Sequence, residues 1–331
     1  MLAAGLRSPR RSWCSPVSRC CLRRAFWTTT RDLAHDASSH DTVDATRTLT
    51  FEAQRLEVLQ RSIDDVVATT VDIDWSICIR DVAGREVAGR NADQSMKTAS
   101  IGKLLLLVEV ARQCAVGELT GTTLLRQDPE LRVADSGIWQ QLQVEELAVH
   151  DLCVLIASVS DNLATNALLK HVGLQRVHDL AESLGLEHTA LLDYVRDHRG
   201  PDDPETLSTG SASELSLLMS QLARNELVSP TVSEQVNAWL VTNVDLSMVA
   251  SVFGLDPLAH APSDRNFVIR NKTGADPGIR ADVGMIGRNA VWLNYAVIAN
   301  WNASDADLRD RALSGMRNIG TILRTTIEIN L

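Results

Sequence analysis

The sequence lacks long apolar runs and is poor in glycine and proline, and each shortage excludes a class of protein. No uninterrupted apolar stretch approaches the roughly 18 residues that a membrane-spanning helix needs. With 18 Gly and 9 Pro among 331 residues, the chain is neither collagen-like nor of low complexity. Because 45% of its residues are hydrophobic, it can build a sizeable core, and we predict a globular protein of one or two domains.

The chain also lacks the cysteine and histidine spacings of metal and redox sites. It contains no CxxC, HxxxH or HExxH pattern, although it has six Cys and eight His. Three cysteines lie near the N-terminus, and the other three (Cys78, Cys114 and Cys153) are far apart within apolar patterns. We therefore predict buried, reduced thiols and no disulfide, metal or other cofactor.

Positive charge is scarce outside the first 31 residues. That segment holds seven Arg and no acid, which leaves 25 basic and 42 acidic residues for the rest of the chain. Since phosphate binding needs clustered positive charge, this composition excludes a nucleic-acid partner. We expect a small-molecule substrate, no membrane span and a monomer.

Residues 1–31 are rich in Arg, Ser and Cys but lack the continuous apolar segment of a secretory signal. Three interpretations stay open: an organellar transit peptide, a start codon placed too early, or a disordered basic tail. Residues 32–47 are polar and are predicted to be a linker, so we expect residues 1–47 to lie outside the folded domain. The missing secretory signal favours a cytoplasmic location.

Hydrophobic periodicity predicts strands near both ends of the folded region and helices between them. Alternating apolar residues indicate a half-buried strand at 71–80, and a turn at 81–84 joins it to a strand at 85–90. Helices are predicted at 49–68, 100–116, 145–158, 162–171, 174–184, 213–224, 231–242 and 304–324. Further strands are predicted at 267–272, 281–287 and 291–300, and residues 193–209, with two Pro and four Asp, read as a long loop.

This order predicts an α/β (α+β) fold with one antiparallel sheet of about five strands, built from both ends of the chain and flanked by helices. We divide the folded part, 48–331, into an α/β lobe (48–98 and 226–331) and an all-helical lobe (99–225). Functional sites are common in clefts between two such lobes, so we expect one here.

A serine and a lysine occupy the start of the most apolar predicted helix, in the segment Ser100-Ile101-Gly102-Lys103. Positions i and i+3 share a helix face, which places the hydroxyl beside the amine. A neutral lysine could accept the proton of Ser100, and a nearby cation such as Lys272 would lower the pKa of Lys103. Alone, the pattern is weak, because Ser100 could equally be a helix N-cap and Lys103 an exposed side chain.

Two further short segments complete a recognisable set. Ser160-Asp161-Asn162 lies between two predicted helices, and Lys272-Thr273-Gly274 ends a predicted strand. Each alone fits a helix cap or a hairpin, but the three occur in order, 60 and 112 residues apart. From about Leu49 to Leu331 the sequence resembles the class A β-lactamases and related penicillin-binding proteins, with their S-x-x-K, S-D-N and K-T-G motifs.

The resemblance implies a role for each matching residue. Ser100 would be the acylated nucleophile and Lys103 its proton acceptor, and Ser160 would pass a proton to the leaving nitrogen. The backbone N–H groups of Ser100 and Ala275 would form the oxyanion hole. The substrate contacts would be Asn162, Lys272, Thr273 and Gly274, with Arg280 assisting at the substrate carboxylate. Trp139 would be either an aromatic lip of the cleft or a buried core residue.

One departure from the family concerns deacylation. The lactamases carry a Glu within an E-x-x-L-N segment of the loop after S-D-N, whereas residues 192–200 here contain no such segment. Asp197, Asp193 and the more distant Glu205 are candidate replacements, and the alternative is that all three are solvated loop acids. Slow hydrolysis of β-lactams through an acyl-enzyme is therefore the leading hypothesis. A D-alanyl-peptide or other amide or ester hydrolase or acyltransferase, and a binding module without turnover, are the alternatives.

Overall fold

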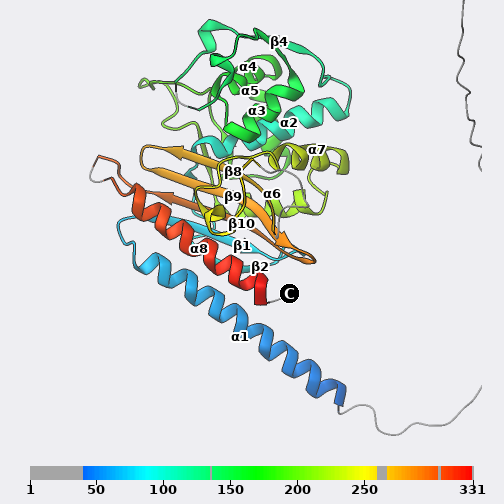
Figure 1. Cartoon of the computed structure of the whole chain (residues 1–331), viewed down its shortest axis with the longest axis vertical. Coiled ribbons are helices and arrows are strands. Elements are labelled where there is room, and N and C mark those ends of the chain that lie inside the picture. Colours follow the sequence, from blue (N-terminus) through cyan, green and yellow to red (C-terminus); the bar gives the residue numbers. More distant parts are fainter. Residues whose placement is uncertain (1–39, 135, 259–266, 305–306, 330–331) are drawn as a thin grey trace, which may run out of the picture. The chain divides into compact units, whose positions relative to one another are not determined.

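The computed structural model describes residues 40–134, 136–258, 267–304 and 307–329, with side chains from residue 54 onward. The chain divides into two units, Met1–Thr48 and Leu49–Leu331. Of the first unit, residues 40–48 are described and are helical. The second unit contains the central sheet and the helices that cover it (Figure 1).

The central element is a five-stranded sheet in which every neighbouring pair is antiparallel. Its order is β2-β1-β10-β9-β8. The strands are β1 (Asp74–Arg80), β2 (Glu86–Arg90), β8 (Val268–Asp276), β9 (Ile279–Arg288) and β10 (Val291–Asn300). The predicted architecture is thus confirmed, because β1 from one end of the folded region pairs with β10 from the other. β8 lies at an edge of this sheet, and no strand among the described residues pairs with its other side.

Successive side chains of each strand point to opposite faces, and both faces are covered. In β10, Tyr295 and Val297 pack on the face that carries α1 (His40–Ala68) and α8 (Arg309–Ile329), whereas Ala296 and Ile298 pack on the other. A Cβ at Gly315 of α8 would lie 2.7 Å from the ring of Trp75, so this glycine lets the helix lie directly on β1. The second face is covered by α6 (Ala212–Ala223).

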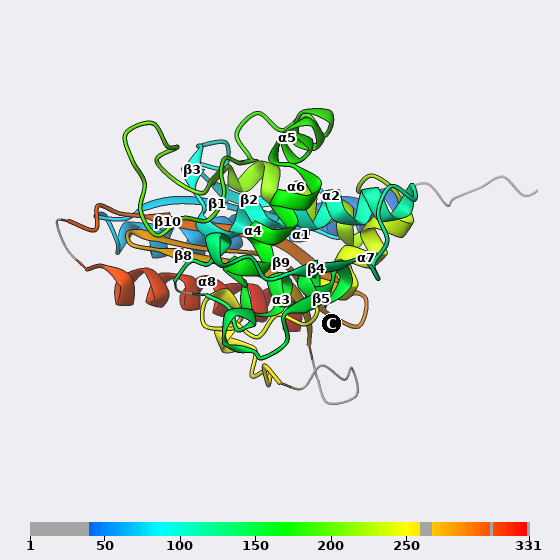
Figure 2. The ribbon, with the colours of Figure 1, turned by 90° about the horizontal axis from the view of Figure 1, so that it is seen from above.

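The remaining helices form a second core around α2 (Lys103–Ala115). They are α3 (Val149–Val159), α4 (Asn162–Val172), α5 (Leu174–Ser183) and α7 (Pro230–Leu240). These helices lie on the side of the sheet opposite α1 and α8, as Figure 1 and the view from above in Figure 2 show. Residues 103–111 of α2 are buried on all sides, as expected of a central helix. Lys103 is the first residue of this central helix, so its side chain lies inside the protein.

The structure also contains short elements that the sequence did not indicate. β3 (Met96–Lys97), β7 (Ser208–Gly210) and β6 (Ala190–Leu191) form one small sheet, and β4 (Leu124–Arg126) pairs with β5 (Glu146–Ala148). Four short 3-10 helices are η1 (Ala99–Gly102), η2 (Pro129–Leu131), η3 (Trp139–Gln141) and η4 (Val249–Val252). Two to four residues are too few for a periodic pattern to appear.

Several predicted boundaries and placements were wrong. α1 begins at His40, so residues 40–47 are helical, and no Gly or Pro interrupts the helix up to Ala68. α8 runs from Arg309 to Ile329 and not from 304 to 324. α6 packs on β1, β9 and β10, although our division of the chain placed its residues in the helical lobe. β1 is buried on both faces, because α6 covers the side that alternation had suggested to be exposed.

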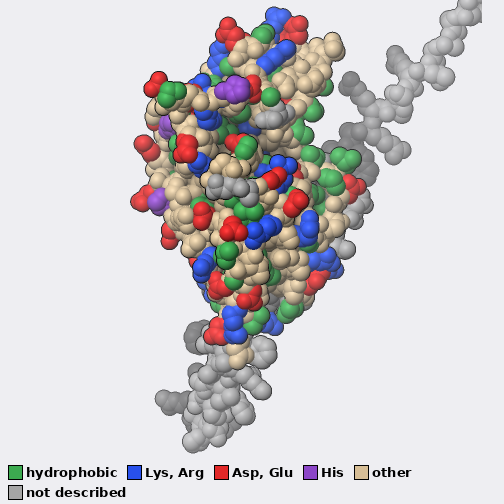
Figure 3. Space-filling model, turned by 90° about the vertical axis from the view of Figure 1, so that its left-hand side faces the viewer, with side chains coloured by type: hydrophobic (Ala, Val, Ile, Leu, Met, Phe, Trp, Pro, Cys, Tyr) green, Lys and Arg blue, Asp and Glu red, His purple; other side chains and the backbone are tan. Residues whose placement is uncertain are grey.

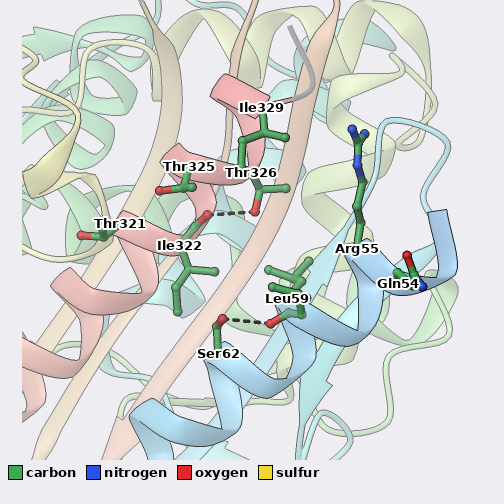
Figure 4. A pocket seen from close by; sticks show the side chains of 10 residues that line it. Gln54, Arg55, Leu59, Ser62, Thr321, Ile322, Thr325, Thr326 and Ile329 are labelled. Atoms are coloured by element: carbon green, nitrogen blue, oxygen red, sulfur yellow. Dashed lines mark hydrogen bonds between the residues drawn. The ribbon is translucent and has the colours of Figure 1, made fainter. Parts of the chain in front are cut away.

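On the face of the sheet that carries α8, the middle of α1 and the C-terminal end of α8 enclose a groove of about 410 Å³ (Figure 4). Its walls include Val58 and Leu59 of α1 and Ile322 and Ile329 of α8. The hydroxyls of Ser62 and Thr326 donate to carbonyls of their own helices, which leaves the walls mainly apolar. None of the residues that line the groove belongs to the three motifs.

Acidic and basic side chains are interspersed on the face shown in Figure 3, which carries no stripe of one sign. Over the described residues, no helix is both long enough and apolar enough to span a membrane.

Candidate active site

Ser100 lies in the 3-10 turn η1, directly before α2, and is half-buried. Ala99, the preceding residue, is buried and has a φ of +49°, a left-handed conformation that is unfavourable for any residue other than glycine. The Ser208 hydroxyl donates to the Ala99 carbonyl at 2.5 Å and so helps hold this turn. The Ser100 side chain caps neither η1 nor α2, which removes the N-cap explanation for this serine.

The edge strand β8 packs directly against this turn. A Cβ at Gly274 would lie 2.2 Å from the Thr98 carbonyl oxygen and 3.2 Å from the backbone nitrogen of Ser100. Only a glycine allows the two backbones to approach so closely. The glycine of the Lys-Thr-Gly motif therefore brings the end of β8, with Ala275, beside the backbone of Ser100.

Lys103 and Lys272 meet at Ser160. The Lys103 ammonium donates to the Ser160 carbonyl at 2.7 Å, the Ser160 hydroxyl at 3.2 Å and the Asn162 side-chain oxygen at 2.7 Å. The Lys272 ammonium donates to the same Ser160 hydroxyl at 3.0 Å and to the Thr273 carbonyl at 2.8 Å. Among the described residues, Ser100 Oγ has no hydrogen-bond partner, so the predicted Ser100–Lys103 pairing is replaced by Lys103–Ser160 contacts. Catalytic hydrogen bonds are often loose before substrate binds.

Both amines are completely buried, which disfavours their charged forms. Burial, followed by the positive charge of Lys272, lowers the pKa of Lys103 well below its usual range, against the opposing charge of Asp161. Burial lowers the pKa of Lys272 to about 8, against the negative charges of Asp245 and Asp282. Three acceptors around Lys103 suit an ammonium while burial favours the neutral amine, so Lys103 is suited both to donate and to accept a proton.

Ser160 and Asp161 owe their positions to the turn between α3 and α4. Ser160 ends α3 with a φ of +56°, which directs the chain back toward α4. Asp161 is buried and caps α4 by accepting from the Ala164 N–H at 2.9 Å. Its other oxygen accepts from the N–H groups of Ile138 and Trp139, so one carboxylate fixes both the helix start and the neighbouring loop.

Asn162 and Asn166 connect this turn to two loops. Asn162 donates to the Ala134 carbonyl at 2.9 Å while its oxygen accepts from Lys103. Asn166, one turn further along α4, donates to the Val195 carbonyl at 3.0 Å and accepts from the Val195 N–H at 2.9 Å. The second amide therefore fixes the 193–199 segment against the helix that begins at Asn162.

Thr273 and Arg280 lie on the same face of the β8–β9 hairpin. Thr273 pairs with Asp282, two residues from Arg280, so Thr273 and Arg280 are diagonal neighbours. The Arg280 guanidinium donates to the carbonyls of Asp276 and Ile279 and lies 6.0 Å from the Trp301 ring. Arg280 is thus at the hairpin tip, beside the motif but outside the Lys103–Ser160–Lys272 cluster.

Trp139 does not form a lip of the cleft. Its side chain is fully buried in the helical core, so the alternative interpretation is correct. The sequence could not decide between the two, because a single Trp beside Ser136-Gly137 fits either environment.

The candidate deacylation acids are already bonded. Both oxygens of Asp193 accept hydrogen bonds, from the Tyr194 N–H and from the guanidinium groups of Arg196 and Arg199. Burial acts to raise the pKa of Asp193, but these bonds outweigh it and hold the pKa below its usual range. Asp197 is exposed and accepts from the Ala134 N–H at 2.7 Å, and Glu205 is exposed and paired with Lys97.

Four buried or half-buried polar residues near Lys272 were missed by the sequence analysis. Asn243, Asp245, Asn271 and Asp282 lie on three separate segments and are joined by hydrogen bonds. Two local signals could have indicated them: Asn271 directly precedes the Lys-Thr-Gly motif, and Asp282 is a lone acid within an apolar strand. No group of three or more metal-ligating side chains is present among the residues that the structure describes.

Comparison with known proteins agrees with this geometry. The model of the "Beta-lactamase enzyme family" matches residues 58–325. A β-lactamase from Sphaerobacter thermophilus is similar in fold, with a TM-score of 0.71 and 24% identity over 82% of this chain and 97% of that chain. PBP-A is also similar, with a TM-score of 0.69 and 21% identity over 82% and 96% of the two chains.

A third similar structure is a single-substitution variant of PBP-A, solved as an acyl-enzyme complex with penicillin G. Its TM-score is 0.67, with 21% identity over 82% of this chain and 97% of that chain. At these identities the solved structures show the fold, and the family match covers most of the chain. The chain therefore belongs to the β-lactamase enzyme family of serine hydrolases.

Proposed function

We propose that the protein hydrolyses β-lactams through an acyl-enzyme on Ser100. One observation carries this proposal: two fully buried lysines, from α2 and from β8, converge on the hydroxyl of Ser160 next to the turn that bears Ser100. Buried amines with lowered pKa values are the groups that can move protons at neutral pH.

In acylation, the Ser100 oxygen attacks the lactam carbonyl carbon and its proton passes to neutral Lys103. The backbone N–H groups of Ser100 and Ala275 hold the oxygen that becomes negative, consistent with the close approach of Gly274 to Ser100. The ring C–N bond then breaks, and the nitrogen takes a proton from the Ser160 hydroxyl. Lys103, which contacts that hydroxyl, returns the proton to Ser160 and becomes neutral again.

In this mechanism Lys272 keeps the Ser160 hydroxyl in place and provides positive charge where the substrate carboxylate would bind, together with Thr273 and Arg280. Asn162 would bind the amide of the substrate side chain while its oxygen holds Lys103.

Deacylation is expected to be slow. It needs a water that is deprotonated beside the ester, and none of the three candidate acids is a buried base without a bonded partner. The Asp193 carboxylate accepts hydrogen bonds from Arg196 and Arg199, and Asp197 is exposed and accepts from a backbone N–H. The same observation favours a second candidate function, in which the acyl group comes from a D-alanyl peptide or another amide or ester and is passed to an acceptor other than water.

Intact-mass spectrometry after mixing with a penicillin tests the proposal. The wild type should gain the mass of one penicillin, and Ser100→Ala should gain none. Ser158→Ala is the matched control, because the Ser158 hydroxyl bonds only to the Val154 carbonyl within α3 among the described residues. An adduct that persists on Ser100→Ala, or none on the wild type with any reactive acyl donor, would contradict the assignment.

A further inference from the structure

The segment between α7 and η4 connects the two sides of the site. The Val244 N–H donates to the carbonyl of Ser158, two residues before Ser160, at 3.1 Å. Next to it, the Asn243 amide donates to the Asn271 side-chain oxygen at 2.8 Å, and Asn271 directly precedes Lys272. One short segment thus contacts both the end of α3 and the strand that carries Lys272.

Asn271 also bonds to a buried carboxyl group, that of Asp282. Its amide donates to Asp282 at 2.9 Å, and the Val249 N–H donates to the other oxygen of Asp282 at 3.0 Å. The segment 243–249 is therefore anchored at both ends, at Asn243 through Asn271 and at Val249 through Asp282. A Cβ at Gly320 would lie 2.2 Å from the Val249 carbonyl, so α8 packs closely on the second anchor.

Two carboxyl groups therefore lie near Lys272, and neither bonds to it directly. Asn243 holds the backbone of Asp245, donating to its carbonyl at 3.1 Å and accepting from its N–H at 3.2 Å, and the Asp245 carboxylate accepts from the N–H and the hydroxyl of Ser247. Asp282 pairs across the sheet with Thr273, the neighbour of Lys272, and points to the opposite face. Asp282 is buried and Asp245 half-buried, and at such positions charges interact more strongly than they do in water.

We propose that Asp245 and Asp282 are positioning residues that keep Lys272 cationic and thereby keep its bond to the Ser160 hydroxyl. As a statement about acylation, this rests on the proposed function. The charge coupling itself does not.

The surrounding charges are consistent with this role. Lys272 lies within electrostatic reach of Lys103 from α2, of Asp245 from the loop and of Asp282 on the opposite face of the sheet. Asp282 is faced by Tyr295 from β10, whose hydroxyl donates to it at 3.1 Å, by Asp245, and by Arg280 on its own strand face. Burial raises the pKa of Asp282 to about 7 and lowers that of Lys272 to about 8, so both groups titrate near neutral pH.

The chain allows a direct test, because it contains only four lysines: Lys97, Lys103, Lys170 and Lys272. Lysine labelled with 13C at Cε would give four NMR signals, assigned by single Lys→Arg variants. In the wild type the Lys272 signal should titrate with a midpoint near its pKa of about 8. Asp245→Asn and Asp282→Asn should each lower that midpoint, by about one pH unit, because each removes a negative charge near the amine.

Asp72→Asn is the matched control, because it also removes one negative charge, at an exposed position where the carboxylate is paired with Arg311. It should leave the Lys272 midpoint unchanged. Thermal unfolding identifies any variant that fails to fold, and the half-buried Asp245 provides a test if the fully buried Asp282→Asn does not fold. The proposal is overturned if folded Asp245→Asn and Asp282→Asn leave the Lys272 midpoint where it is.

The second readout is the pH profile of acylation of Ser100 by a penicillin. The alkaline limb should move to lower pH in Asp245→Asn and Asp282→Asn and stay in place in Asp72→Asn. An alkaline limb that does not move while the Lys272 midpoint does would overturn the positioning role. If the wild type forms no adduct at all, the proposed function fails, while the NMR titration still decides whether the charges are coupled.

Discussion

Two groups of charged residues flank the site, and they differ in whether their charges are paired. Among the described residues no carboxylate bonds to the buried amine of Lys103 or of Lys272, whereas Asp193 in the neighbouring loop accepts from two guanidinium groups. The pKa of Lys103 and that of Asp193 are both lowered. A lowered pKa makes a lysine available as a neutral base, but it makes a carboxylate a weaker one. The difference supports the proposal of an enzyme that is acylated readily and deacylated slowly.

Removing the amine of Lys103, at the start of α2, should have the largest effect on acylation. We expect Lys103→Met to slow acylation of Ser100 by about 10²- to 10⁴-fold, because the general base is lost. The rate of adduct formation, followed by intact mass, measures this. Lys97→Met is the control, since Lys97 is partly exposed and paired with Glu205, and it should acylate at nearly the wild-type rate. Equal rates in both variants would show that the buried amine is not the base.

Displacing β8, the strand that carries Lys272, should have the second-largest effect on acylation. In Gly274→Ala the new Cβ would collide with the Thr98 carbonyl, so β8 must shift away from Ser100. We expect acylation to fall by about tenfold to a hundredfold and unfolding free energy to fall by about 1–3 kcal/mol, as for other overpacked positions. Gly117→Ala is a control for substituting a glycine, because a Cβ there meets nothing within 4 Å, although its φ of +77° adds some strain. A Gly274→Ala variant that acylates normally would contradict the close approach as the basis of the oxyanion hole.

Removing the Asp193 carboxylate, which bonds to Arg196 and Arg199, should lower the stability of the protein but leave the rate of acylation unchanged. We expect Asp193→Asn to lower the unfolding free energy by about 1–3 kcal/mol at pH 7, because the arginines lose a charged partner. The pKa of Asp193 is depressed in the folded state, so its stabilisation is present above the unfolded value of about 4 and is lost as pH falls through the folded value. Chemical denaturation at pH 7 and pH 3 should therefore show a deficit that shrinks in acid. A deficit that grew in acid would contradict this assignment.

Asp197→Asn should have the smallest effect. The side chain is exposed and accepts one backbone hydrogen bond, so we expect the deacylation rate to stay within about twofold of the wild type. A burst experiment with a chromogenic cephalosporin gives both rates, with a burst near one equivalent followed by slow turnover. If Asp197→Asn lost deacylation alone, Asp197 would be identified as the missing base.

The long elements could be predicted because their signals are local. The alternation in β1, the turn before β2 and the apolar periodicity of α2 each extend over enough residues to be distinctive, and the three motifs mark most of the site. Periodicity could not show that α6 would cover the second face of β1, since that depends on the packing of distant segments. For the same reason it could not separate a buried Trp139 from an exposed one.

The polar residues behind the site were hidden for another reason. Asn243, Asn271 and Asp282 belong to different segments, and each alone looks like an ordinary polar residue in a loop or strand. Their structural role depends on hydrogen bonds that form only when the sheet and the loop come together. Asn166 was closer to being predictable, because it lies one turn after Asn162 on the same helix.

The pairing of β1 with β10 also has a consequence for how the protein is made. β1 is synthesised early but is flanked in the sheet by β10, which leaves the ribosome after all of the helices around α2. Contacts between such distant parts of a chain form slowly, and an unpaired apolar strand is prone to aggregation. The helical core can therefore assemble during translation, whereas β8, with Lys272 at its edge, reaches its place beside Ser100 only when synthesis of the folded region is nearly complete.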